Sequence, residues 1–260
     1  MFLNSYAGGM SNNMRAFTII TCIISAIDAF SFVPSLEQRY FGSGSHQLLK
    51  AASGDATILP FDPRYSAEGP VGFGDFIIDK EGGPTEEELE ETNLVKIVNL
   101  NCTDLEVNTL VWKCLGYRYN PQTKSWDNEG CFPKWKEKYP SPPDLIGMQR
   151  KYSPEIDKPS LRSNQALVRS IPSQNKQNLK QYLRPYGFNG YKYEGLTPNM
   201  TRRAQCTNWL LYYKLNLFGV SLEELIRRKQ ERQEAIKRED DEIAARGEER
   251  PWRAPTDEAY

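Results

Sequence analysis

A series of helix start and stop signals most constrains what this chain can fold into. Two Thr-x-x-Glu capping boxes, at Thr85 and Thr103, predict helix starts, because each supplies partners for backbone amides that a first helical turn leaves free. The first of these helices is expected to end near residues 99–101. Gly116 predicts the end of the second, since glycine readily adopts the left-handed conformation of a helix C-terminus.

Further signals predict three more helices, which start at Ser170 or Ser173, at Thr197-Pro198 and at Ser221. A hydroxyl at the cap followed by proline favours a helix start, because proline fixes a helical φ where no amide donor is needed. The second of these helices is expected to bury Trp209. The last carries Glu and Arg four residues apart and few apolar residues, so it is expected to be charged and projecting.

The remaining segments complete the predicted fold. Alternating aromatic residues around Asn120-Pro121 predict a short β-hairpin. Residues 148–169 are polar and contain proline, and they are expected to be a mobile insertion. Residues 61–92 are expected to be an extended arm with an acidic helix start. The predicted fold class is therefore mainly α: a small helical domain with a short β-hairpin, an extended N-terminal arm and a projecting charged C-terminal helix.

The first 60 residues predict where the protein works. Arg15 precedes an apolar run over 16–27, and Ala29-Phe30-Ser31 supplies small residues for cleavage, which predicts a signal peptide over 1–31. The run is about a dozen residues, shorter than the roughly 20 that a membrane span needs, and no membrane span is expected in the mature form. Residues 32–60 are expected to be a transit segment. Plain secretion is the alternative.

Phe32, which follows the predicted cleavage point, resembles the cleavage motif of bipartite plastid presequences in algae with secondary red plastids. That resemblance implies a location in the chloroplast stroma or on the stromal face of the thylakoid.

Charge is segregated along the chain. Residues 93–220, the expected α-rich core domain, carry 19 basic and 9 acidic side chains, whereas residues 1–92 and 221–260 are net acidic. A basic domain attracts anionic partners such as nucleic acid or an acidic protein surface. The alternative is that the acidic flanks fold back and neutralise the core.

The sequence lacks the residues that several common catalytic and metal-binding sites need. The single histidine, His46, lies in the predicted transit segment, so a mature chain has no Ser-His or Cys-His pair. No P-loop and no CxxC pair occurs, and no cofactor or metal is expected. Asp144, after two prolines, could bind a ligand or shape a turn. A carboxylate-pair hydrolase stays open, but the residues favour a non-enzymatic role.

Basic and aromatic residues are the candidate binding set. The basic candidates for an anionic partner are Arg202, Arg203, Lys176, Lys180, Arg184 and Lys192. The candidates for an aromatic surface are Tyr117, Tyr119 and Trp126. Such residues can hold phosphates and stack on bases. Two cations at a helix start oppose its dipole, which indicates either an anionic partner or a buried ion pair. The alternative for the aromatic residues is that they fill the core.

Four stretches, residues 110–127, 139–147, 169–183 and 187–214, together resemble an uncharacterised domain family of cyanobacteria and plastid-bearing eukaryotes. The resemblance implies a plastid setting and assigns no activity or ligand residues. The favoured hypothesis is a non-enzymatic plastid interaction module, an assembly, stability or regulatory factor of a stromal or thylakoid-peripheral complex. One alternative is RNA or ribosome binding through the basic core; another is an enzyme of unrecognised class.

Overall fold

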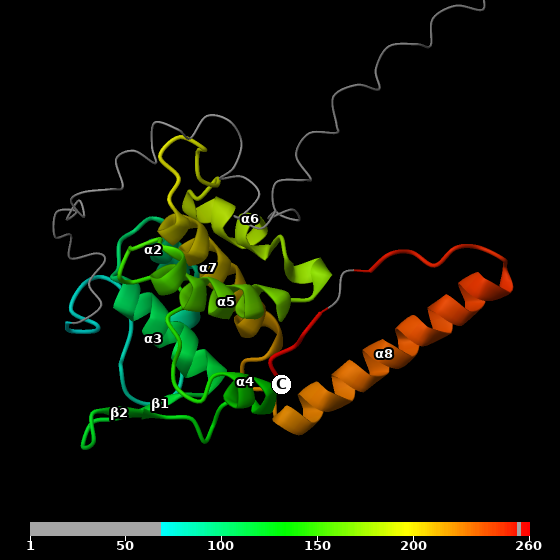
Figure 1. The fold of residues 1–260 in the computed structure, drawn as a ribbon, viewed down its shortest axis with the longest axis horizontal. Helices are drawn as coiled ribbons and strands as arrows, with labels where there is room; N and C mark the ends of the chain where they lie inside the picture. Colours follow the sequence, from blue (N-terminus) through cyan, green and yellow to red (C-terminus); the bar gives the residue numbers. More distant parts are fainter. Residues whose placement is uncertain (1–68, 254–255) are drawn as a thin grey trace, which may run out of the picture. The chain divides into compact units, whose positions relative to one another are not determined.

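Helix α7 is the central helix of the described part of the chain, on which four of the other α-helices pack (Figure 1). It runs over Pro198–Asn216 and contacts α2 (Glu91–Val98), α3 (Asp104–Leu115), α5 (Pro154–Arg169) and α6 (Asn178–Leu183). The computed structural model describes residues 69–253 and 256–260, which belong to one compact unit. The predicted signal peptide, the transit segment and the start of the arm lie outside the described residues.

Shorter elements and one long helix complete the fold. They are η3 (Glu87–Leu89), β1 (Arg118–Asn120), β2 (Ser125–Asp127), α4 (Pro133–Lys138), η4 (Ser173–Asn175), η5 (Arg184–Tyr186) and α8 (Leu222–Ala245). The strands β1 and β2 pair antiparallel with Tyr119 opposite Trp126. The described part of the chain is therefore mainly helical with a two-stranded hairpin, which confirms the predicted fold class.

The capping signals act as predicted at α3. Thr103 accepts from the amide of Glu106, and the Glu106 side chain accepts from the amide of Thr103, so both halves of the capping box are formed. Gly116 ends the helix with φ of 104°. A Cβ at this position would lie 2.0 Å from the carbonyl oxygen of Gly130, so both the conformation and the close approach require glycine.

The helix expected from Thr85 is divided in two. The Thr85 capping box forms, since the amides of Thr85 and Glu88 donate to each other's side chains. However, it starts only the single turn η3, because Glu90 is extended with ψ of 145° before α2 begins. The helix expected from Ser170 or Ser173 is likewise shorter, with α6 beginning only at Asn178.

The prediction of a mobile insertion over residues 148–169 is wrong. Pro154–Arg169 forms the 16-residue helix α5, which packs on α7. Four of its five buried residues are spaced i, i+3, i+4 and i+7, the period of an inward helix face. These four are Ser160, Ser163, Asn164 and Leu167, and the first three are small and polar. A search for apolar period alone therefore misses the helix.

The core is built around the aromatic face of α7. Trp209 is fully buried, as predicted, and its indole nitrogen donates to the Ser170 hydroxyl at 3.0 Å. Tyr213 stacks on it with ring centroids 5.6 Å apart. Helix α8, by contrast, is exposed along most of its length and buries Leu225 and Ile243. Among the described residues, no helix combines the length and apolar character needed to cross a membrane.

Candidate functional site

The structure places the two arginines of the candidate set in the interior. Arg202 is 3% exposed and forms a bidentate pair with Asp157, at 2.7 and 2.6 Å. Arg203 is fully buried, and its Nε and Nη2 donate to one carboxylate oxygen of Asp104 at 2.9 and 2.7 Å. The expectation that they form an exposed anion-binding surface is wrong, and the alternative of a buried ion pair is what the structure shows.

Arg203 ties α7 to the junction of α2 and α3. Besides Asp104, its guanidinium donates to the carbonyl oxygens of Ile97 and Cys102 at 3.2 and 3.0 Å. Burial raises the pKa of the Asp104 carboxyl, and the Arg203 charge together with a hydrogen bond from Asn199 opposes that rise. Two cations at the start of α7 are therefore explained by internal structure.

Acidic residues of the arm neutralise two further core cations. Lys113 is buried against Glu88, and Lys214 lies 2.7 Å from Glu91. Both acids belong to residues 61–92, so part of the net positive charge of the core is balanced by the flank, as one alternative proposed.

The other basic candidates lie on a different part of the surface. Lys180, Arg184 and Lys192 are exposed and Lys176 is half-buried. Lys176 follows η4, Lys180 lies in α6 and Arg184 begins η5. They do not join Arg202 and Arg203 in one surface, because those two point inward.

The aromatic candidates divide between the core and the hairpin. Tyr117 is fully buried, and its hydroxyl donates to the carbonyl oxygen of Tyr139. Tyr119 and Trp126 are half-buried neighbours with ring centroids 5.4 Å apart, and Trp126 also meets Trp112 edge to face. Lys80 of the arm lies 4.0 Å from the Tyr119 ring centroid. The hairpin aromatics therefore already have partners from within the chain.

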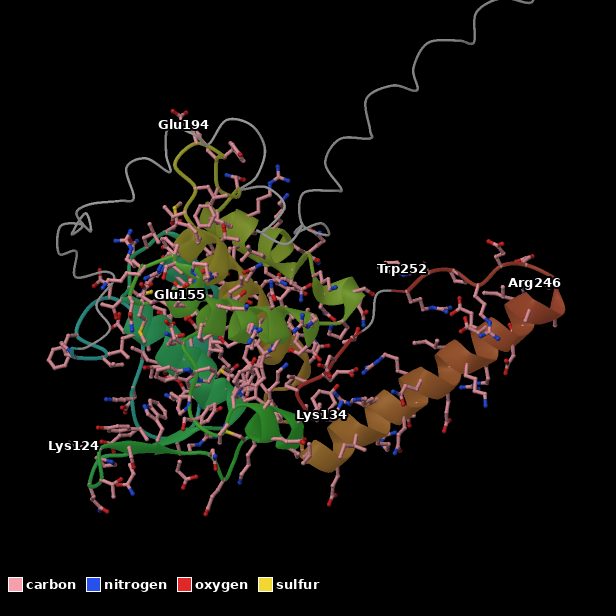
Figure 2. The ribbon with its side chains drawn as sticks, in the orientation of Figure 1. Lys124, Lys134, Glu155, Glu194, Arg246 and Trp252 are labelled. Carbon is pink, nitrogen blue, oxygen red and sulfur yellow. The ribbon has the colours of Figure 1, made fainter. Side chains whose placement is uncertain are left out.

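A cleft of about 670 Å³ lies between the end of α4, the loop after it and α5. Its volume is within the range of roughly 300–1,000 Å³ typical of ligand sites. The lining residues are Lys138, Tyr139, Pro143, Asp144, Pro159, Ser160, Arg162, Gln165 and Arg169. Figure 2 labels Lys134 on α4 and Glu155 on α5, the two helices beside the cleft. Apart from Asp144, none of these residues was predicted as a site residue. Five of the nine lie in residues 148–169, which were expected to be a mobile insertion.

Asp144 holds the cleft together rather than offering a free carboxylate. One of its oxygens accepts from the Asn108 amide and from the backbone amides of Ile146 and Gly147 at 2.9–3.0 Å. The other accepts from the amide of Met148 at 2.8 Å and the Ser160 hydroxyl at 3.0 Å. With five donors on two oxygens, this side chain shapes the turn and joins α3 to α5.

The cations of the cleft have no such partners. Within the described residues, Lys138, Arg162 and Arg169 form no ion pair, and all three are exposed. Burial raises the pKa of the Tyr139 phenol, while the charges of Arg169 and Arg162 oppose that rise. The cleft therefore combines three cations, an aromatic ring and one satisfied carboxylate, a set that suits an anionic group.

The cysteines do not form a reactive or metal-binding site. Cys102, Cys114, Cys131 and Cys206 are all buried and reduced. Burial raises the pKa of Cys102, Cys131 and Cys206 to about 12, so the nucleophilic thiolate is suppressed. Among the described residues, no group of three or more Cys, His, Asp or Glu side chains could hold a metal ion.

The fold and the cleft define a small, mainly helical domain with a basic cleft. Residues 88–215 match the family DUF1823, a domain of unknown function. A structure solved by solution NMR is 36% identical; the match covers 52% of this chain and 95% of that chain, with a TM-score of 0.39. No significant match was found among curated proteins.

Proposed function

We propose that this protein is a non-enzymatic interaction module that holds an anionic segment of a partner protein in the cleft between α4 and α5. One observation carries the proposal: Lys138, Arg162 and Arg169 line one cleft without an ion-pair partner among the described residues. Elsewhere the domain pairs its buried cations with acids of its own, as at Arg202 and Arg203. Because these three cations lack an ion-pair partner among the described residues, an anionic segment can pair with them.

The lining supports binding rather than catalysis. The lone pairs of Asp144 are occupied by five donors, and the Ser160 hydroxyl is committed to that carboxylate. The phenol of Tyr139 has a raised pKa, so it stays protonated, and it donates to the carbonyl oxygen of Arg162 at 3.4 Å. A general base and an activated nucleophile are the groups that hydrolysis by side chains needs, and the described lining offers neither.

The plastid address is the second part of the proposal. We infer from the signal-like residues 1–31 and from Phe32 that the chain is delivered to a plastid, where it serves as an assembly, stability or regulatory factor of a stromal or thylakoid-peripheral complex. A reporter fused to residues 1–60 should enter the plastid of an alga with a secondary red plastid, and Phe32→Ala should keep it outside. If the Phe32→Ala reporter enters the plastid as efficiently as the unmodified reporter, the proposed plastid-targeting role of Phe32 is wrong.

Affinity capture from isolated plastids tests the proposed function. The wild-type chain is compared with a cleft variant, Arg162→Glu with Arg169→Glu, and with a control, Lys180→Glu with Arg184→Glu, that changes net charge by the same amount. We expect the wild type and the control to retain a defined protein complex and the cleft variant to lose it. Treatment with nuclease should not change the captured material. Equal capture by all three chains would refute the role of the cleft.

RNA binding is the second candidate, because one loop carries the residues that it needs. Tyr193 is 90% exposed and Tyr186 is 44% exposed, and the loop also carries the exposed cations Arg184 and Lys192. Exposed rings beside cations can stack on bases and hold phosphates. If nuclease removes the captured material, and the Lys180→Glu with Arg184→Glu variant loses it while the cleft variant retains it, this second function replaces the first.

A further inference from the structure

The C-terminal segment returns along α8 (Figure 1, orange and red; Figure 2 labels Arg246 and Trp252 on it). Arg253 pairs with Glu239 and Asp240, near the end of α8. Five residues later, Glu258 pairs with Arg232 and Lys229, about two and three turns further toward the start of the helix. The described residues 247–253 and 256–260 therefore run antiparallel to α8.

Residues 257–260 insert into a groove between α4, α5 and α8. The amide of Asp257 donates to the carbonyl oxygen of Arg169 at 3.1 Å, and the amide of Trp135 donates to the carbonyl oxygen of Ala259 at 3.2 Å. These bonds hold the main chain and do not depend on its side chains. They are the contacts by which a groove accepts an extended peptide.

Two side chains of the segment give the groove its selectivity. Glu258 is 7% exposed and lies 3.1 Å from Lys229 and 2.6 Å from Arg232. Tyr260 is also 7% exposed; its ring meets Phe132 with centroids 6.0 Å apart, and the Lys229 ammonium lies 5.8 Å from its centroid. The groove thus recognises a carboxylate and, two residues later, an aromatic ring.

We propose that this groove is a docking site for an extended acidic–aromatic segment of a protein partner, and that residues 257–260 occupy it in cis until such a segment displaces them. Phe132, Trp135 and Arg169 belong to the matched family domain, whereas the segment that fills the groove and its ion-pair partners Lys229 and Arg232 on α8 lie beyond residue 215, where the match ends. Charge complementarity favours the same occupant, since Lys229 and Arg232 require a carboxylate between them.

The proposal is independent of anion binding in the cleft, because the groove uses the carbonyl of Arg169 and the cleft uses its side chain. A tethered segment competes at an effective concentration on the order of millimolar, so a free peptide binds the intact chain weakly. Weakening the tethered segment should therefore strengthen the binding of a free one.

Fluorescence anisotropy with a labelled peptide of residues 247–260 tests this in the full chain. We expect Glu258→Gln to bind the peptide about tenfold more tightly than wild type, since it removes two charge-assisted contacts of the competitor. The matched control is Asp257→Asn, at a side chain that is 66% exposed and 4.0 Å from Lys134; it should bind like wild type. The double variant Lys229→Glu with Arg232→Glu should release residues 257–260, but it also reverses the charge of the groove. This variant should therefore not bind the labelled peptide.

Hydrogen exchange and light scattering complete the test. Amides of residues 257–260 should exchange faster in Glu258→Gln while those of α7 stay protected, which shows release without unfolding. The proposal is overturned if the segment stays protected in that variant, or if the variant binds the peptide no better than wild type. A Glu258→Gln chain that dimerises would assign the groove to a second copy and would also overturn it.

Discussion

Replacing Arg203 with methionine should destabilise the domain more than any loss of a single surface contact. The guanidinium is fully buried and donates to Asp104, to the Ile97 carbonyl and to the Cys102 carbonyl. Its loss leaves the buried Asp104 carboxylate with the Asn199 amide as its remaining side-chain donor. Removing one partner of a buried ion pair typically costs about 3–5 kcal/mol, against a total of about 5–15 kcal/mol for a domain.

Urea unfolding followed by circular dichroism measures this loss, with an unchanged dependence on urea concentration as the sign of an intact two-state transition. In thermal unfolding the same loss corresponds to a midpoint lower by roughly 6–20 °C for a domain of this size. Asp104→Leu combined with Arg203→Met should recover much of the loss, because no charge then stays buried alone. A loss below about 1 kcal/mol for the single variant, or a double variant no more stable than the single one, would refute this reasoning.

Three further predictions concern the core, the thiols and the C-terminal segment. Trp209→Ala should cost about 3–5 kcal/mol in urea unfolding, because the side chain is fully buried, whereas Trp252→Ala, at a side chain 83% exposed, should change stability by about 0.5 kcal/mol or less. The four described cysteines should react with a thiol reagent at pH 8 only after denaturant is added, and rapid labelling of the native chain would contradict their burial. Burial raises the pKa of Glu258, but hydrogen bonds from Lys229 and Arg232 outweigh it, so the folded pKa lies below the unfolded value of about 4.3. The contribution of Glu258 is therefore fully present above about pH 4.3 and lost as pH falls through its folded pKa, which hydrogen exchange of residues 257–260 should show; equal protection at pH 3 and pH 7 would contradict it.

Local signals in the sequence predict much of the fold. The capping boxes at Thr85 and Thr103, the stop at Gly116 and the cap at Thr197 lie where the structure has them, because each depends on a few adjacent residues. The same locality explains the error at Glu90, whose extended backbone divides the first helix and is not marked by glycine or proline.

The candidate site could not be predicted in the same way. Lys138, Arg162 and Arg169 come together because Asp144 bonds to Asn108 and Ser160, residues 36 positions before it and 16 positions after it. Such contacts leave no mark in a local pattern. The small polar face of α5 is the one signal that was present, at Ser160, Ser163 and Asn164, and a search for helical period that includes Ser and Asn would have found that helix.

Direct binding to a defined anionic segment tests the central claim, that the cleft between α4 and α5 holds the acidic part of a protein partner. A labelled decapeptide of glutamate and a labelled decamer of uridylate are titrated separately with the full chain. We expect the peptide to bind in low salt and to weaken as salt screens the contact. Arg162→Glu with Arg169→Glu should abolish that binding, and the control Lys180→Glu with Arg184→Glu should leave it unchanged. Peptide binding that ignores the cleft variant, or binding of the uridylate decamer alone, would contradict the claim.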